Sequence, residues 1–118
     1  AAHTTEIKAY TFDPMKLPGN EIDSYVNIKK GKPLNILASL HVDGGKPVWF
    51  RNIHLIVINS YGKLLVDTTS NTVLGGYASF FTNTEKWNSG NYMAIVSYLG
   101  STSEEYPLAY KIFILYIK

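Results

Sequence analysis

The chain has 118 residues, of which 46% are hydrophobic and 17% charged, so we predict one packed domain over residues 1–118. The formal net charge of +2 is too small to indicate a nucleic-acid partner, and the basic cluster at 29–32 is interpreted as a solvated turn. Cysteine is absent, which excludes disulfides, thiolate metal sites and cysteine nucleophiles. No run approaches the roughly 18 apolar residues of a membrane-spanning helix.

Apolar and polar residues alternate with a period of two along most of the sequence, which predicts short strands. In chain order the predicted strands lie at residues 6–12, 25–28, 34–40, 53–58, 64–68, 77–81, 90–100 and 109–117. Prolines and glycines between the first two strands predict a break in an edge strand, because proline offers no N–H to a ladder. Residues 69–72 are predicted to form a polar loop. Residues 83–89 are predicted to form a helical turn capped by Thr84.

The stretch 90–100 is the strand around which the other predicted strands are arranged. One face carries Tyr92, Ala94, Val96 and Tyr98, and the other carries Met93, Ile95 and Leu99. Apolar residues on both faces predict a central strand. The last strand is also apolar on both faces, which raises the possibility that it pairs with a neighbouring chain in a self-assembling subunit. Seven or eight short strands without helices predict an all-β, antiparallel two-sheet sandwich.

From residue 28 to the C-terminus the turn and loop signals follow a recognisable order. They are Lys30-Gly31, Gly45-Lys46-Pro47, Asn59-Ser60-Tyr61-Gly62, the Thr-rich loop 68–76 and Gly90-Asn91-Tyr92. This order resembles the immunoglobulin-like modules of bacterial and archaeal cell-surface or secreted proteins. The resemblance implies an immunoglobulin-like Greek key and a non-catalytic role as a spacer or an adhesion and protein-interaction domain. It also implies an extracellular or cell-surface location within a longer chain, with other protein domains or surface components as partners.

The same resemblance gives a role to Tyr92. It is similar to the tyrosine corner of that family, in which a tyrosine near the start of strand F donates its hydroxyl to an upstream backbone group. Ala94, two residues further on, then falls where antibody domains carry a cysteine, so packing is expected to replace the disulfide.

The polar residues give no constellation that carries chemistry. The three histidines, His3, His41 and His54, lack the spacing of a zinc site. Ser39, His41 and Asp43 follow one another along one face of a single strand, whereas a catalytic triad converges from separate elements. We therefore predict no catalytic, cofactor-binding or metal-binding residues and no enzymatic activity.

Aromatic side chains suggest the alternative function. Trp49, Tyr61, Trp87 and Tyr106 are predicted near loops or strand ends, where exposed rings could stack on the apolar faces of sugars. Tyr77 is a further ring of this kind. The alternative is therefore a carbohydrate-binding module. The competing interpretation is that Trp87 closes one end of the sandwich and that Trp49 packs where its loop enters the next strand.

Overall fold

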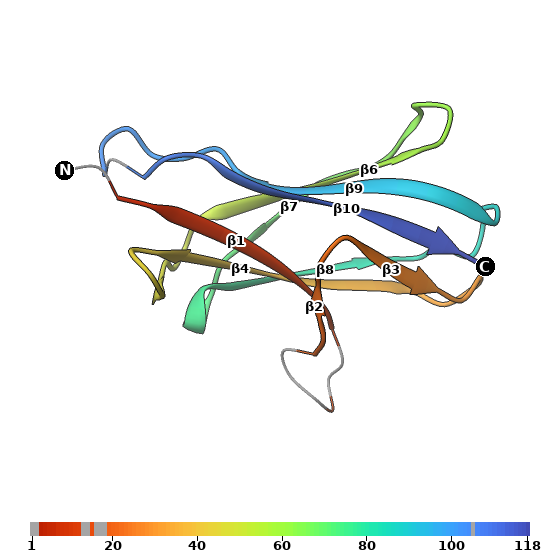
Figure 1. Cartoon of the computed structure of the whole chain (residues 1–118), viewed down its shortest axis with the longest axis horizontal. Helices are drawn as coiled ribbons and strands as arrows, with labels where there is room; N and C mark the ends of the chain where they lie inside the picture. The colour runs from red at the N-terminus through yellow and green to blue at the C-terminus, as the bar shows by residue number, and fades with distance from the viewer. Residues whose placement is uncertain (1–2, 13–14, 16–18, 105) are drawn as a thin grey trace.

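The computed structural model describes residues 3–12, 15, 19–104 and 106–118, which form two facing β-sheets (Figure 1). The strands are β1 (Thr5–Thr11), β2 (Glu21–Ile22), β3 (Tyr25–Ile28), β4 (Leu34–Val42), β5 (Lys46–Pro47), β6 (Asn52–Asn59), β7 (Leu64–Asn71), β8 (Tyr77–Thr82), β9 (Gly90–Tyr98) and β10 (Ala109–Ile117). A 3-10 turn, η1 (Leu74–Gly76), is the only helical element in the described ranges. No helix there is long and apolar enough to cross a membrane.

The strand order is that of an immunoglobulin-like Greek key. Sheet A has the order β2-β1-β4-β5, with β8 also paired to β4, and sheet B has the order β3-β10-β9-β6-β7. The layers therefore group β1, β4 and β8 on one side and β6, β9 and β10 on the other, as strands A, B, E and C, F, G do in immunoglobulin domains. The predicted fold class is confirmed. Among the strands of the described residues, β3 alone departs from antiparallel pairing and runs parallel to β10.

The core lies between the two sheets and is built from alternate residues of the longer strands. Its largest fully buried apolar side chains are Leu34, Ile36, Leu40, Val42, Ile53, Leu55, Val57, Val96, Phe113, Leu115 and Ile117. Burying one such side chain stabilises the folded state by roughly 1.5–3 kcal/mol. Ala94 is fully buried in the same cluster, and the chain has no cysteine. Apolar packing therefore holds the two sheets together.

The N-terminal segment contributes to both sheets. β1 pairs with β4 in sheet A over seven residues, and β2 adds a short outer rung to β1. The chain then crosses over and adds β3 to sheet B. This is the interrupted edge strand expected from the sequence. The prolines of the break, Pro14 and Pro18, lie outside the described residues.

One local expectation is wrong, and a second holds only in part. β7 continues through Asn71, because the polar segment 69–71 pairs with β6 up to Asn52. Pairing on an edge strand depends on backbone N–H and C=O groups and not on apolar side chains. A polar sequence therefore does not reveal that these residues form a strand. At 83–89 the Asn83 side chain accepts a hydrogen bond from the N–H of Glu85, and the Thr84 hydroxyl donates to the carbonyl of Lys32. A single turn does form, because the N–H of Trp87 donates to the Thr84 carbonyl at 2.9 Å. The Thr84 side chain joins two loops instead of capping this turn, and no helix begins there.

Part of the last strand is already paired on both sides, so this strand cannot pair with a neighbouring chain along its whole length. β10 lies between β9 and β3, and residues 114–117 are paired on both sides. Its apolar character comes instead from its two faces, one toward the core and one toward the outside of sheet B.

Candidate functional site

The four aromatic residues suggested for sugar stacking lie at opposite ends of the sandwich. Tyr61, which is 94% exposed, lies in the β6–β7 turn, at the end where β9 begins. Trp87 lies at that same end, in the loop before β9. Trp49 and Tyr106 lie at the other end, near the start of β6 and after the end of β9. The fold does not bring these four rings into one row.

Two of the four rings also have partners within the chain. Trp87 is half-buried and stacks on Tyr92 with ring centroids 5.0 Å apart. Tyr106 packs edge-on against His3 at 4.8 Å and borders the core. Trp49 is 45% exposed. The Tyr92 hydroxyl donates a 2.5 Å hydrogen bond to the carbonyl oxygen of Asn88, the contact that defines a tyrosine corner.

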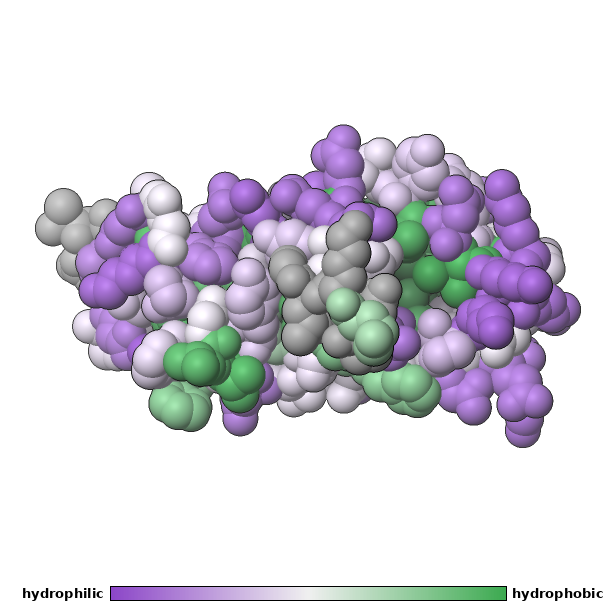
Figure 2. Space-filling view, turned by 90° about the horizontal axis from the view of Figure 1, so that it is seen from below, coloured by the Kyte–Doolittle hydropathy of each residue, from purple (hydrophilic) through white to green (hydrophobic). Residues whose placement is uncertain are grey.

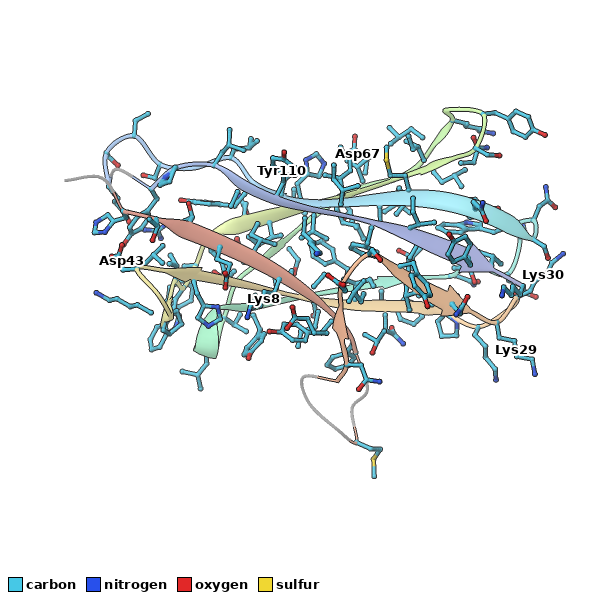
Figure 3. The ribbon with its side chains drawn as sticks, in the orientation of Figure 1. Lys8, Lys29, Lys30, Asp43, Asp67 and Tyr110 are labelled. Carbon is cyan, nitrogen blue, oxygen red and sulfur yellow. The ribbon has the colours of Figure 1, made fainter. Side chains whose placement is uncertain are left out.

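The outer surface of sheet B is unusually apolar for a sheet that faces solvent. We call it the apolar face; it consists of Tyr25, Ile56, Ile58, Leu64, Met93, Ile95, Tyr110, Ile112, Ile114 and Tyr116. These residues alternate with the buried positions of the same strands. In Figure 3, Tyr110 and Asp67 mark the side of sheet B that bears this face, directed away from sheet A. Outward faces of antiparallel sheets are ordinarily polar.

The rows of the apolar face run across the central strands. Ile56, Ile95 and Ile112 are in register in one row, which ends at Asp67 on the edge strand β7. The next row contains Ile58 and Met93 and continues through Ile114 on β10 to Tyr25 on β3. Among the described residues of this surface, Asp67 is the one formally charged group, and it contacts His54. The centre of the face thus carries no charge.

A depression opens on the outer surface of sheet A, the face seen in Figure 2. It encloses about 530 Å³, and its walls include Glu6, Lys8, Tyr10, His41, Asp43 and Tyr77. Figure 3 labels Lys8 and Asp43 on this side of the molecule. The Tyr77 ring lies edge-on to the rings of both Tyr10 and His41, with centroids 6.3 Å apart in each pair.

One rim of the depression is held by an ion-pair contact. Nδ1 of His3 lies 2.6 Å from Oδ2 of Asp43, and the N–H of Thr4 donates to Oδ1 at 3.2 Å. The hydrogen bond with His3 lowers the pKa of the Asp43 carboxyl below its usual value of 3.8. The Thr4 N–H adds to this effect, while desolvation opposes it. Asp43 therefore bonds His3 at the chain start and makes no bond to His41, so no Ser39–His41–Asp43 triad forms.

A buried hydroxyl lies on β4 next to two of the side chains that line the depression. Ser39 is 0% exposed, and no described residue provides a hydrogen-bond partner for its Oγ. Its chain neighbours Ala38 and Leu40 face the core, so Ser39 faces outward. Its cross-strand partners are Lys8 and Tyr77, both of which line the depression.

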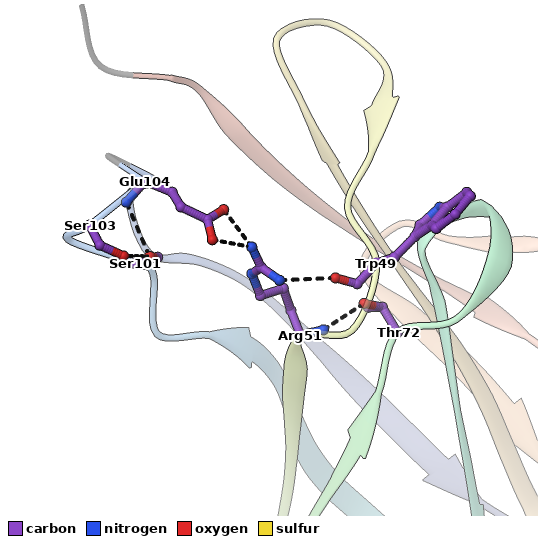
Figure 4. Close-up of polar contacts among 6 residues, drawn as sticks. All are labelled: Trp49, Arg51, Thr72, Ser101, Ser103 and Glu104. Atoms are coloured by element: carbon purple, nitrogen blue, oxygen red, sulfur yellow. Dashed lines mark hydrogen bonds and ion pairs between the residues drawn. The ribbon is translucent and has the colours of Figure 1, made fainter.

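A second polar cluster fastens the β9–β10 loop to the start of β6 (Figure 4). The Arg51 guanidinium contacts both carboxylate oxygens of Glu104 and donates to the Trp49 carbonyl at 3.1 Å. The pair with Glu104 raises the pKa of Arg51. Thr72, fully buried, accepts from the Arg51 N–H through its hydroxyl at 3.0 Å. Figure 4 shows the Trp49 ring directed away from Glu104.

The backbone beside Arg51 is strained, and its hydrogen bonds explain why the strain persists. Phe50 has φ 59°, which is unusual for a bulky residue. Its N–H donates to the Thr72 carbonyl, and the Thr72 N–H donates to the Arg51 carbonyl, both at 2.8 Å. Burial raises the pKa of the nearby Tyr98 phenol, and Arg51 partly offsets that effect. These contacts hold the β9–β10 loop against the start of β6, and the charges of Arg51 and Glu104 neutralise each other.

The comparisons with known proteins give no family for this chain. No family model matches, and no curated protein matches. Among solved structures, the chain is similar to the CARDB domain of a Pyrococcus furiosus protein, solved in complex with di-metal ions. The identity is 14%, the TM-score is 0.42, and the match covers 98% of this chain and 87% of that one. A likeness at this TM-score carries no conclusion, and the fold assignment rests on the strand order given above.

The described part of the chain does not bring potential metal ligands together into a site. No group of three or more His, Asp or Glu side chains there could hold a metal ion. The residues that the fold does bring together, Lys8, Tyr10, His41 and Tyr77, come from three strands. Their proximity depends on the pairing of β4 with both β1 and β8. Alternation in the sequence places each residue on a face of its own strand but does not reveal which strands are neighbours.

Proposed function

We propose that this chain is a single, non-catalytic immunoglobulin-like module of a cell-surface or secreted protein, and that it pairs with a second copy of itself through the apolar face of sheet B. The observation that carries the proposal is the uncharged row of Ile56, Ile95 and Ile112 across three adjacent strands. A simple spacer has no need of such a surface, because a sheet face toward solvent is normally polar. The surface location is supported by the order of sequence signals described above.

The shape of the face favours a second copy as the occupant. Two sheets with the same right-handed twist pack well face to face at about −30°, as they do inside β-sandwiches. Two copies of sheet B have the same twist, so they meet this condition. The one formal charge of this surface is Asp67, at the β7 end of the central row, and it contacts His54. The isoleucine-lined centre therefore brings no like charges together and offers a charged partner nothing complementary.

The size of the face sets the expected strength. Five strands about 4.8 Å apart, over six residue steps of about 3.4 Å from Tyr110 to Tyr116, give a footprint of about 500 Å² per copy. Stable complexes bury about 800 Å² per partner, and smaller interfaces are transient. The expected dimer is therefore reversible, with a dissociation constant of roughly micromolar or weaker.

Sedimentation velocity over protein concentrations from about 10 µM to about 1 mM tests the proposal. The wild type should shift from monomer to dimer across this range. Ile112→Lys, at a position already 45% exposed, should weaken pairing by at least about tenfold with little change in stability, because a dimer would bury the new charge. The matched control is Phe81→Lys, which places the same charge at an exposed apolar position of β8 in sheet A. A wild type that stays monomeric throughout, or equal weakening by both variants, would rule out this interface.

A further inference from the structure

We infer that the depression on the outer surface of sheet A binds carbohydrate, and specifically a neutral pyranose unit of a glycan or polysaccharide. The site is separate from the apolar face, which lies on the other sheet. Of the aromatic residues that the sequence suggested for stacking, this site contains Tyr77, and its remaining walls come from β1, β4 and the turn after β4.

The depression is formed where three segments of sheet A meet. Its lining comes from β1, from His41 and the turn that follows β4, and from Tyr77 at the start of β8. Ser39 lies buried beneath this lining, with Lys8 opposite on β1 and Tyr77 opposite on β8. The space of about 530 Å³ lies within the range of sites that bind small molecules.

The buried hydroxyl beneath the lining favours a polar ligand. A buried donor without a partner is costly, so such a group calls for a structural or functional explanation. Ser39 faces the side on which the depression opens, and Lys8, His41 and Tyr77 surround it on that side. A ligand that carries its own hydroxyls, and that shifts these rings aside, would give this group a partner.

The walls combine the two properties that sugar recognition requires. A pyranose presents an apolar C–H surface, which suits the electron-rich faces of the Tyr10 and Tyr77 rings. Its hydroxyls both donate and accept, and the walls offer donors and acceptors in Lys8 and Glu6.

The charges of the walls favour a neutral ligand over an ionic one. The Nζ of Lys8 lies 3.7 Å from the Glu6 carboxylate, so the two charges oppose each other. Asp43 is already bonded to His3 and Thr4. A phosphate or a metal cation would therefore meet groups of both signs. A nucleic acid would meet no basic surface here.

Backbone amide NMR titrations with methyl glucoside, methyl galactoside, methyl mannoside and N-acetylglucosamine, each to about 100 mM, test the inference. We expect at least one sugar to bind with a millimolar dissociation constant and to shift the amides of residues 6–10, 39–43 and 77. Sodium phosphate over the same range should not shift this set. If no sugar shifts these amides, or if phosphate alone does, a neutral-sugar site is excluded.

Variants connect any binding to the proposed walls. Tyr77→Ala should weaken sugar binding by at least about tenfold, the factor that one good contact provides. Tyr61→Ala, which removes an almost fully exposed tyrosine from the β6–β7 turn, should leave binding unchanged. Ser39→Ala keeps the packing volume and removes only the hydroxyl, so it should fold at least as stably while binding at least about threefold more weakly. Unchanged sugar affinity in both Tyr77→Ala and Ser39→Ala would overturn the assignment.

Discussion

The hydroxyl of Tyr92 donates a 2.5 Å hydrogen bond to the carbonyl oxygen of Asn88, four residues earlier in the chain. The same ring stacks on Trp87, so one side chain fixes the loop before β9 through a polar and an apolar contact. Because β9 lies in the middle of sheet B, this corner fixes where the central strand begins.

Replacing the corner hydroxyl should therefore have a measurable cost. Tyr92→Phe keeps the stacked ring and removes one partly buried hydrogen bond, so we expect a loss of about 1 kcal/mol in the free energy of unfolding. Urea denaturation measures this loss. Tyr61→Phe is the matched control, because Tyr61 is almost fully exposed and should change stability by less than about 0.5 kcal/mol. Equal effects would show that the corner bond does not contribute.

Two glycines with nearly the same backbone angle should respond differently to alanine. Gly76 has φ 81° and Gly62 has φ 84°. A Cβ at Gly76 would lie 2.6 Å from the Leu40 carbonyl oxygen, whereas one at Gly62 would meet nothing within 4 Å. Gly62→Ala should cost about 1 kcal/mol from the left-handed conformation alone, and Gly76→Ala about 3 kcal/mol. Thermal or urea unfolding checks both, and similar losses would contradict the close approach of η1 to β4.

The contact between His3 and Asp43 should depend on acid pH in a defined direction. The folded-state pKa of Asp43 lies below the usual value of 3.8, chiefly through the His3 hydrogen bond. The contact therefore contributes stability above pH 3.8, and this contribution is lost as the pH falls through the folded-state pKa. A carboxyl-carbon NMR titration should show the depressed pKa in the wild type and a value nearer 3.8 in His3→Ala. An unchanged Asp43 pKa in His3→Ala would contradict the contact.

The two tryptophans should differ in fluorescence. Trp49→Phe leaves only Trp87, which is half-buried against Tyr92, so its emission should be blue-shifted and poorly quenched by iodide. Trp87→Phe leaves only Trp49, whose emission should be red-shifted and readily quenched. If both variants were quenched to the same extent, the stacked position of Trp87 would be wrong.

The sequence was most informative where side chains alternate and least informative where pairing joins distant segments. Tyr25–Ile28 and Ala109–Ile117 have the predicted bounds, because burial on one or both faces determines the residue types along a strand. The polar end of β7 was missed, because an edge ladder relies on backbone groups that every residue has. The aromatic residues suggested for stacking lie at different places in the fold, because residue type alone does not determine which side chains come together. Of the depression in sheet A the sequence indicated Tyr77 alone, because the other walls come together only when β1 and β8 pair with β4.

The parallel pair of β3 and β10 also has a mechanical consequence. In Figure 1 the first described residues and the C-terminus lie at opposite ends of the long axis. The pair is closed by hydrogen bonds from Ile114 N–H to Ser24, from Lys118 N–H to Ile28 and from Lys30 N–H to Lys118, between 2.7 and 3.0 Å. A force that pulls the two ends apart runs along these strands, so it loads the bonds together in shear instead of opening them one by one. Resistance to such a force would therefore be concentrated in the four-residue pairing of β3 with β10.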